Sequence, residues 1–506
     1  MTAFPPRFNR RAPRPAAPEV ARGFAPPRRR RGTILIVTIL IVFTLAALVV
    51  VFCRAMRVEA IASANFAASL QAAAAERGAE QYVLALLTEQ KDALADLTEE
   101  YFFQVPVGPP DVDNKHAGYF WIVRPDYGDL DLPIYGLTEE AAKLNVNSAD
   151  QESLLRLPNM TDDVVMAILD WRDENSTPEA NGAENEYYLG LPEPYVAKNA
   201  PFETVEELLM VRGVSRELLY GLGTNLPIGQ GASFTQANSR DATELKAARG
   251  LYDLLTTYSS EPGAPAAEST ATPRPDDETA PEGAGATQKI NVNEASQRTR
   301  LTELLNTQLG ETRGDAVVQQ IRRTREFDSP FDFAEKAGLK PEELDLIFGS
   351  ITTTAGQDIP GRININTAPR DVLMTLPGLE TADVDKLIAQ RQGSTVAADK
   401  SVAWVIEALG EQKANGLGDR VTTTTSQYSA DIVAASGNGR AYKRVRIVVD
   451  AAGATPQIVY RREITERGWP LDPQILASLR AGQGPDGATT GGLGGSRGPM
   501  PGGTLR

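Results

Sequence analysis

The sequence predicts an α+β protein in which one long N-terminal helix packs on an antiparallel sheet and an α-helical domain of repeats is inserted between the strands. Three observations lead to this class. An uncharged stretch, Thr33 to Cys53, continues without proline into an Ala-rich stretch that ends near Leu97. An Asn-containing motif occurs three times in the middle of the chain. Segments with strand character occur only before and after these motifs. A chain of 506 residues is long enough for several such parts.

Composition excludes several classes of function. Hydrophobic residues make up 42% of the chain and charged residues 23%, which is typical of a globular protein. One cysteine, Cys53, excludes a disulfide framework and a Cys-rich zinc site. One histidine, His116, leaves no pair for a His-based metal centre, and we expect it to be a solvated loop residue. We therefore expect no enzyme.

The N-terminal region predicts a single membrane span. Residues 1–32 form a basic leader with nine arginines and one acid, whereas the whole chain carries −15. The next 21 residues, 33–53, are uncharged and long enough as a helix to cross a roughly 30 Å hydrocarbon layer. The positive-inside rule then keeps the N-terminus in the cytoplasm and the body in the periplasm of a bacterium, anchored in the inner membrane. A secretory signal peptide is the alternative, but no A-x-A-like site follows the span. Residues 54–97 are expected to continue the helix as an amphipathic segment.

The leader resembles the class III leaders of type IV pilins and type II secretion pseudopilins. The resemblance rests on the basic run that ends in Gly32 and on the apolar helix that follows. It implies that a prepilin peptidase cuts after Gly32 and that Thr33 becomes the methylated N-terminus. The chain departs from the family in starting with Thr and in having Val37 where most members have Glu. The absent Glu resembles the K type of minor pseudopilin, and an uncleaved anchor is the alternative.

The body contains three copies of a repeat. Residues 143–173 align without gaps to residues 362–392, and another copy begins at Lys289. Each copy opens with Asn-x-Asn, which predicts a short extended segment before a helix, and the first and last copies continue through a Leu-Pro turn to a second helix. Partner segments follow the first two copies at 201–221 and 330–350, and both begin with Pro-Phe, which aligns Phe202 with Phe331. We assign the copies to residues 138–258, 288–354 and 361–420. Arg172 and Arg391 occupy equivalent positions, and we expect them to brace their helices through carbonyls or acids.

The repeats resemble helix-hairpin-helix units of K pseudopilins and of bacterial competence DNA receptors. Such units usually bind the DNA backbone through hairpin N–H groups and nearby basic residues. The hairpins at 158–163 and 377–381 have no basic residue, and residues 138–225 hold 17 acids against 6 bases. We therefore expect no nucleic acid and predict protein interaction. A membrane-anchored helix-hairpin-helix DNA receptor of a competence system is the alternative.

An acidic insertion, 174–200, interrupts the first copy. The candidate oxygen donors in and just before it are Asp170, Asp173, Asn175, Glu179, Glu184 and Glu186. Calcium prefers such ligands on irregular loops, but the spacing is not that of an EF-hand, so a solvated acidic loop remains the alternative. The D-W-x-D and G-A-E-N-x-Y-Y stretches are similar to the K pseudopilin, whose family includes calcium-bound members. This resemblance implies a structural calcium site with Asp173 and Glu184 as ligands, together with Asp170, Asn175 and Glu186.

The remaining segments predict linkers and a sheet. Residues 259–287 are rich in Pro, Ala and acids and predict a disordered linker, and residues 482–506 predict a disordered Gly-rich tail. Strands are expected at 118–124, 427–434, 441–450 and 457–462. Residues 118–137 and 427–471 would form one antiparallel, pilin-like sheet on the long helix, and 251–258 a small strand or helix. We expect core or loop packing, rather than a ligand cage, for Trp171, Trp404, Tyr187 and Tyr188.

The resemblance implies a minor pseudopilin at the tip of the type II secretion pseudopilus. Such a subunit initiates fibre assembly for protein export across the outer membrane. Its implied partners are minor pseudopilins of the I and J types, the major pseudopilin, the prepilin peptidase and the inner membrane.

Overall fold

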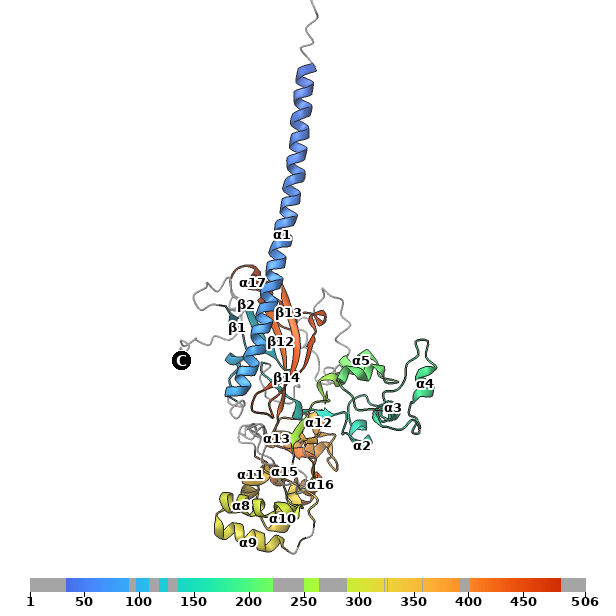
Figure 1. Ribbon diagram of the computed structural model, residues 1–506, viewed down its shortest axis with the longest axis vertical. Coiled ribbons are helices and arrows are strands. Elements are labelled where there is room, and N and C mark those ends of the chain that lie inside the picture. Colours follow the sequence, from blue (N-terminus) through green and yellow to red (C-terminus); the bar gives the residue numbers. More distant parts are fainter. Residues whose placement is uncertain are drawn as a thin grey trace, which may run out of the picture. The chain divides into compact units, whose positions relative to one another are not determined.

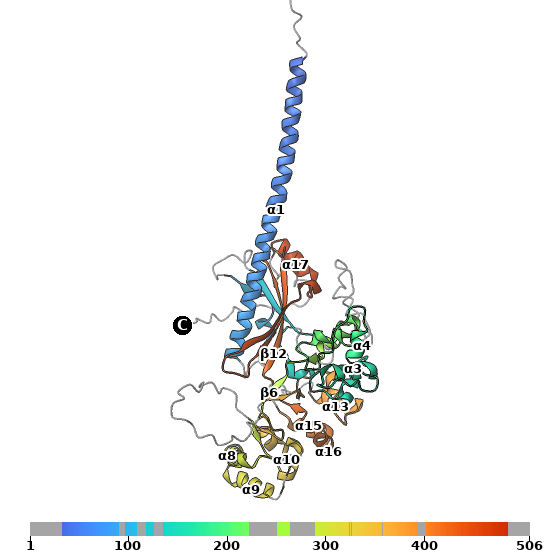
Figure 2. The same ribbon diagram turned by 45° about the vertical axis from the view of Figure 1, so that its right-hand side comes forward.

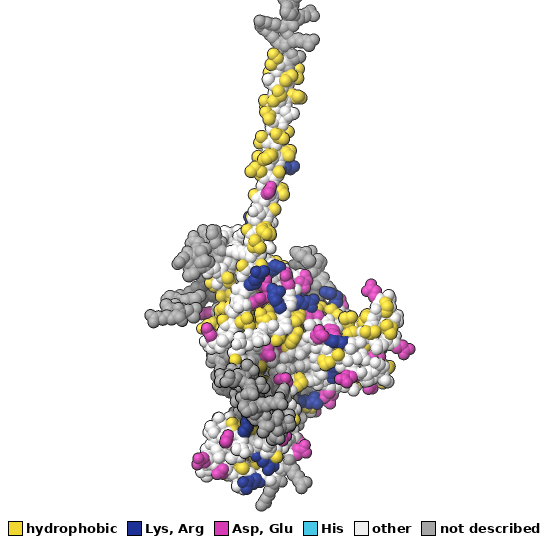
Figure 3. All heavy atoms as spheres, viewed as in Figure 1, with side chains coloured by type: hydrophobic (Ala, Val, Ile, Leu, Met, Phe, Trp, Pro, Cys, Tyr) yellow, Lys and Arg dark blue, Asp and Glu magenta, His cyan; other side chains and the backbone are white. Residues whose placement is uncertain are grey.

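The computed structural model describes residues 33–90, 97–108, 118–125, 135–221, 250–263, 289–322, 324, 326–356, 358–391 and 401–483. The chain divides into two compact units, Met1–Ala64 and Asn65–Arg506. Helix α1 spans Thr33–Glu89. Its N-terminal part is covered with exposed hydrophobic side chains (Figure 3). Within the described ranges, α1 alone is long and apolar enough to cross a membrane.

Helix α1 ends at Glu89, so the prediction that it reaches Leu97 is wrong. Its last buried side chain is Leu87. Beyond that point no further side chain of the helix packs on the sheet, and a helical turn without packing is marginal in water. Residues 91–96 lie outside the described residues.

One antiparallel sheet forms the centre of the second unit, in the order β1-β2-β12-β13-β14, with β3 also paired to β12. Its strands are β1 (Val105–Val107), β2 (Gly118–Val123), β3 (Thr138–Glu139), β12 (Gln427–Ala435), β13 (Tyr442–Asp450) and β14 (Gln457–Glu463). The four predicted strands are confirmed to within one residue at each end, and β1 and β3 were not predicted. Strands β2 and β12 pair although some three hundred residues separate them, so the repeats are inserted between strands of one sheet.

Two helices cover opposite faces of this sheet (Figure 2). Side chains alternate along a strand, so Phe120 and Ile122 pack against α1, whereas Tyr119 and Trp121 pack against α17 (Pro473–Arg480). Gly118 permits the close approach of α1, because a Cβ at this position would lie 2.9 Å from the Cβ of Ala75. Helix α17 was not predicted, and residues after 483 lie outside the described part of the tail.

The three repeats each close with a two-residue parallel ladder. The ladders pair β4 (Leu144–Asn145) with β5 (Leu255–Thr256), β7 (Ile290–Asn291) with β8 (Ile351–Thr352), and β10 (Ile363–Asn364) with β11 (Val421–Thr422). The first strand of each ladder is the predicted Asn-x-Asn segment. We call the units repeat 1 (138–258), repeat 2 (288–354) and repeat 3 (361–422), the last of which closes two residues beyond its predicted end at 420. Their buried apolar side chains form one continuous core.

Short helices fill each repeat (Figure 1). Repeat 1 has η3 (Glu140–Ala142), α2 (Gln151–Leu155), α3 (Asp162–Arg172), α4 (Asn185–Leu189), η4 (Val205–Met210), α5 (Arg216–Tyr220) and η6 (Leu251–Asp253). Repeat 2 has η7 (Ala295–Gln297), α8 (Arg298–Leu309), α9 (Glu311–Ile321), α10 (Pro330–Ala337) and α11 (Pro341–Phe348). Repeat 3 has α12 (Arg370–Leu373), α13 (Thr381–Arg391), α15 (Ala403–Leu409) and α16 (Glu411–Gly416). Two 3₁₀ turns, η2 (Glu99–Tyr101) and η8 (Thr465–Arg467), lie outside the repeats.

The linker predicted at 259–287 starts too early. Ser260–Pro262 form strand β6, which pairs antiparallel with β9 (Asp358–Pro360). Glu261 is only 4% exposed, because its carboxylate is bonded inside the protein. Residues 264–287 of the predicted linker, residue 288 of repeat 2 and residues 222–249 of repeat 1 lie outside the described residues.

Candidate functional site

The predicted processing site lies at the start of α1. Gly32 is outside the described residues, and Thr33 is the first residue of the helix. Val37, at the place where most pilin-like proteins have Glu, is 53% exposed on the apolar helix. The structure therefore offers no side chain at this position that could neutralise an amine.

The acidic loop of repeat 1 buries two carboxylates, Asp170 at the end of α3 and Glu184 just before α4. Asp170 is 0% exposed and Glu184 is 2% exposed. Asp170 Oδ1 accepts a hydrogen bond of 3.2 Å from the Glu179 N–H. Asp170 Oδ2 and both carboxylate oxygens of Glu184 have no hydrogen bond of good geometry within the described part of the chain. Gly182 makes room for this arrangement, because a Cβ there would lie 1.9 Å from Asp170 Oδ2.

Asn199, which the sequence analysis did not single out, adds a further buried oxygen. Its Oδ1 also lacks a hydrogen bond among the described residues, while its Nδ2 donates to the Asn175 carbonyl and, at 3.2 Å, to Ser176 Oγ. Asn199 reaches Asp170 and Glu184 only because of how the loop folds back, and the spacing of these residues in the sequence does not reveal this. Several buried oxygens without donors are costly unless something compensates them.

Burial raises the pKa of Asp170, and the carboxylate of Asp173 adds to this effect despite backbone hydrogen bonds from the loop. Burial also raises the pKa of Glu184, and Asp170 and Asp173 raise it further, outweighing polar contacts with Asn199. A bound cation would remove this penalty. An oxygen-only donor set with loose geometry fits calcium. The described residues hold no three His, Cys, Asp or Glu side chains close enough together to bind one metal ion, so Asn199 and backbone carbonyls would have to complete the shell.

The other predicted ligands lie differently. Asp173 is half-buried and accepts hydrogen bonds from Asn175, at 3.1 Å from its N–H and 2.8 Å from its Nδ2. Asn175 and Glu186 are exposed. The structure therefore brings Asp170, Glu184 and Asn199 together, with Asp173 nearby, and leaves Asn175 and Glu186 at the surface.

An aromatic cluster supports this loop, as predicted. The Trp171 ring lies 5.2 Å from that of Tyr188 and 6.2 Å from that of Tyr195, and Trp171 Nε1 donates to Glu207 at 3.0 Å. Tyr188 is fully buried, and the ring of Tyr187, which is 41% exposed, lies 5.2 Å from that of Tyr188, so the predicted core or loop packing is confirmed for both. Trp171 follows Asp170 directly and therefore reports on the loop.

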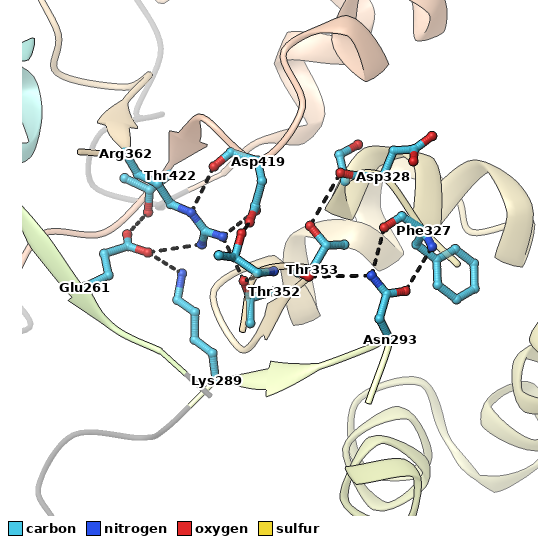
Figure 4. Close-up of polar contacts among 12 residues, drawn as sticks. Glu261, Lys289, Asn293, Phe327, Asp328, Thr352, Thr353, Arg362, Asp419 and Thr422 are labelled. Atoms are coloured by element: carbon cyan, nitrogen blue, oxygen red, sulfur yellow. Dashed lines mark hydrogen bonds and ion pairs between the residues drawn. The ribbon is translucent and has the colours of Figure 1, made fainter. Parts of the chain in front are cut away.

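The second Asn of each Asn-x-Asn motif clamps the partner segment of its own repeat. Asn147 donates to the Phe202 carbonyl at 2.9 Å and accepts from the Phe202 N–H at 2.7 Å. Asn293 makes the same pair of bonds with Phe327, at 2.9 and 2.8 Å (Figure 4). In repeat 3, Asn366 donates to the Ser401 carbonyl at 3.0 Å.

This clamp corrects the predicted alignment of the partner segments. Phe202 corresponds to Phe327, four residues before the Phe331 that the Pro-Phe pattern suggested. Repeat 3 also has a partner segment, formed by α15 and α16, which the sequence analysis missed. Trp404 Nε1 in α15 donates to Asn366 Oδ1 at 3.0 Å, and Trp404 is buried as predicted.

The predicted arginine braces are confirmed. Arg391 donates to the carbonyls of Ile365 at 3.1 Å and Ala368 at 2.8 Å. Arg172 donates to the equivalent carbonyls of Val146 and Ala149. Each guanidinium thus ties the end of the second helix to the Asn-x-Asn turn.

A buried charge precedes each Asn-x-Asn motif, and the sequence analysis did not single it out. Lys143 pairs with Glu140. Lys289 and Arg362 share Glu261, at 2.6 and 3.3 Å (Figure 4). Arg362 also pairs with Asp419. This buried charge could have been predicted from the sequence, because a basic residue stands two positions before the first Asn in all three copies.

Repeat 1 docks on the hairpin of repeat 3. Arg156 donates to the carbonyls of Leu376 at 3.1 Å and Leu379 at 3.0 Å, and Ser153 donates to the Thr375 carbonyl at 3.0 Å. The basic side chain nearest the first hairpin is thus bonded within the chain instead of being free for a phosphate.

Comparisons with known proteins bear on repeat 1. Residues 137–228 match a family model described as Type II secretion system (T2SS), protein K. A 55-residue stretch is 38% identical to Type II secretion system protein K of Pectobacterium carotovorum subsp. carotovorum, covering 11% of this chain and 17% of that protein. The chain thus aligns with about a sixth of the length of this relative. The resemblance to this family that the sequence predicted is confirmed.

A solved structure was also matched, the GspK-GspI-GspJ complex from the enterotoxigenic Escherichia coli Type 2 Secretion System. The match covers 78% of this chain and 96% of that chain at 12% identity, with a TM-score of 0.32. At this TM-score the likeness supports no argument about this chain.

Proposed function

We propose that this chain is a minor pseudopilin of the K type and that it initiates the pseudopilus of a type II secretion system from the fibre tip. The observation that carries the proposal is the match of residues 137–228 to protein K of that system, over the repeat that holds the acidic loop. An apolar span at the start of α1 and an antiparallel sheet interrupted by the repeats support it.

The proposed mechanism is assembly without chemistry. A peptidase cuts after Gly32, Thr33 becomes the methylated N-terminus, and the body lies in the periplasm. In pilin-like fibres a Glu near the N-terminus pairs with the amine of a neighbouring subunit inside the membrane, where an unpaired charge is costly. Val37 cannot make this pair, which suits a subunit with no predecessor in the fibre. Minor pseudopilins of the I and J types are the proposed neighbours, because the resemblance to protein K implies them, with the major pseudopilin below them.

Mass spectrometry of the N-terminus tests the assignment. The protein is purified from membranes of cells with and without a prepilin peptidase. A chain that begins at methylated Thr33 only when the peptidase is present is the expected result. An intact leader in both strains would reject the pseudopilin assignment, and a salt-dependent shift of labelled duplex would favour a DNA receptor instead.

We further propose that the acidic loop holds a structural calcium ion through Asp170, Glu184 and Asn199. Calcium should raise the melting temperature of the full chain relative to a chelator-treated sample. It should also change the summed fluorescence of the four tryptophans, of which Trp171 lies beside the site. Asp170→Asn and Glu184→Gln should each abolish the response. The control is Glu193→Gln, which removes an exposed carboxylate from the same loop and should keep it. Equal melting in calcium and chelator would reject the site.

A further inference from the structure

The three repeats differ at the position of the arginine brace. In repeats 1 and 3 the side chain at the end of the second helix is Arg172 or Arg391, and each donates to main-chain carbonyls of the Asn-x-Asn turn. The inward-facing positions of the three second helices have the same spacing. They are Val165, Ile168 and Arg172 on α3, Val384, Leu387 and Arg391 on α13, and Gly314, Val317 and Ile321 on α9.

Repeat 2 therefore has Ile321 where the other repeats have arginine. Val292 is the equivalent of Val146 and Ile365, because each follows the first Asn of the motif and donates its N–H to the closing strand, at 3.0, 2.9 and 3.0 Å. The side chain of an isoleucine cannot donate a hydrogen bond. Among the interactions of the described residues, none satisfies the Val292 carbonyl, while the Ala295 carbonyl accepts from the Arg298 N–H.

A cavity of about 940 Å³ opens at this place in repeat 2. Its apolar lining comes from Val292, Leu301, Val318, Ile321 and Phe327. Its rim carries two basic and two acidic exposed side chains, Arg298, Arg322, Glu303 and Glu311. The rim thus has no net charge that would repel a cation.

We propose that this cavity binds an arginine side chain supplied by a partner protein chain. Its guanidinium would donate to the Val292 carbonyl, as Arg172 and Arg391 do to the equivalent carbonyls in their own repeats. Its aliphatic stem would pack on Leu301 and Phe327, because arginine buries its methylenes along apolar surfaces. Arginine fits better than lysine, since its planar fork offers several donors in fixed directions.

The neighbouring arginines of the chain do not provide this contact in the described part of the structure. Arg322 is exposed and makes no hydrogen bond to Val292. Arg323 and Arg325 lie outside the described residues. The site depends on the geometry of the repeats and is independent of the proposed secretion function.

Saturation-transfer NMR on the full chain in detergent tests the site with N-acetyl-arginine amide as the probe. The matched control probe is N-acetyl-citrulline amide, which has the same shape without the charge. We expect at least a fivefold larger transfer to the arginine probe. Ile321→Arg should supply the brace within the chain and abolish the difference, without lowering the melting temperature.

Two further variants keep the test decisive. Leu346→Arg places the same new side chain on an exposed position of α11, 53% exposed in the same repeat, and should leave probe binding unchanged. Thr302→Trp fills the cavity from α8 and should abolish binding. It serves as the test variant if Ile321→Arg does not fold. Three results would each overturn the proposal. They are equal transfer to both probes, full binding by a correctly folded Ile321→Arg, and no transfer to the unmodified protein because an arginine at 322, 323 or 325 fills the cavity.

Discussion

Glu261 joins repeats 2 and 3 through a single buried carboxylate. Glu261→Gln should therefore lower the free energy of unfolding through one well-defined change. The glutamine keeps the shape of the side chain but removes the charge that faces Lys289 and Arg362, whose side chains are 6% and 3% exposed. Asp419 remains for Arg362, so Lys289 loses its ion-pair partner in this cluster. Removing one partner of a buried pair costs about 3–5 kcal/mol, and we expect about 3 kcal/mol because Asp419 remains.

Urea unfolding of the full chain in detergent, followed by the summed fluorescence of its four tryptophans, measures this loss. Glu463→Gln is the control, since its pair with Lys443 is 48% and 30% exposed and should contribute less than about 1 kcal/mol. The double variant Glu261→Gln/Lys289→Met should recover part of the stability by removing the stranded charge. A cost below about 1 kcal/mol for Glu261→Gln would refute the assignment of this carboxylate as the shared partner.

The same carboxylate predicts a pH dependence. Burial alone would raise the pKa of Glu261, but Lys289 and Arg362 outweigh it and hold the pKa below its usual value. Its contribution to stability is therefore fully present above the ordinary glutamate pKa and is lost as the pH falls through the lower folded value. Glu261→Gln should flatten this part of the acid unfolding curve.

Three further predictions concern other contacts. Asn293→Ala removes both bonds to Phe327 and should lower the free energy of unfolding by about 2 kcal/mol in urea melts, whereas the exposed Gln308→Ala should change it little. Glu76→Gln should leave stability unchanged or raise it at pH 7, because burial raises the pKa of Glu76 and Glu80 still bonds Arg461 at 2.6 Å. In parallel melts the difference from the unmodified protein should vanish as the pH falls below about 4, and a loss of stability at pH 7 would contradict the reasoning. Gly182→Ala should abolish the calcium-dependent rise in melting temperature by pushing Asp170 aside, while Gly190→Ala, whose Cβ would meet nothing nearer than 3.4 Å, should keep it.

Periodic and gapless patterns predicted the parts of the fold that depend on local rules. The four longest strands of the sheet were placed to within one residue because alternation and flanking turns mark them, whereas the short β1 and β3 were missed. Arg172 and Arg391 were recognised as braces because an alignment without gaps keeps their distance from the Asn-x-Asn turn. The start of α1 at Thr33 follows from the change from charged to apolar residues.

Features that depend on the path of the chain in space were missed or misplaced. The partner segment of repeat 3 has no Pro-Phe pair. What the three partner segments share is a main-chain carbonyl that accepts a hydrogen bond from the second Asn of the motif. Strand β6 lies in a Pro-rich stretch, and only the burial of Glu261 reveals its role. Asn199 joins Asp170 and Glu184 through a loop that no spacing rule describes. Helix α1 has no glycine or proline at its end, so the sequence carried no stop signal there.

The β6–β9 ribbon makes repeat 2 a side branch of the chain. The chain leaves through β6 and returns through β9, and the two ends of the branch lie so close that a Cβ on Gly263 would be 2.3 Å from the Gly356 carbonyl. A short turn between these two glycines would span the same gap. A chain could therefore gain or lose a whole repeat at this point without rerouting the segments on either side, which offers a simple route by which such proteins differ in length.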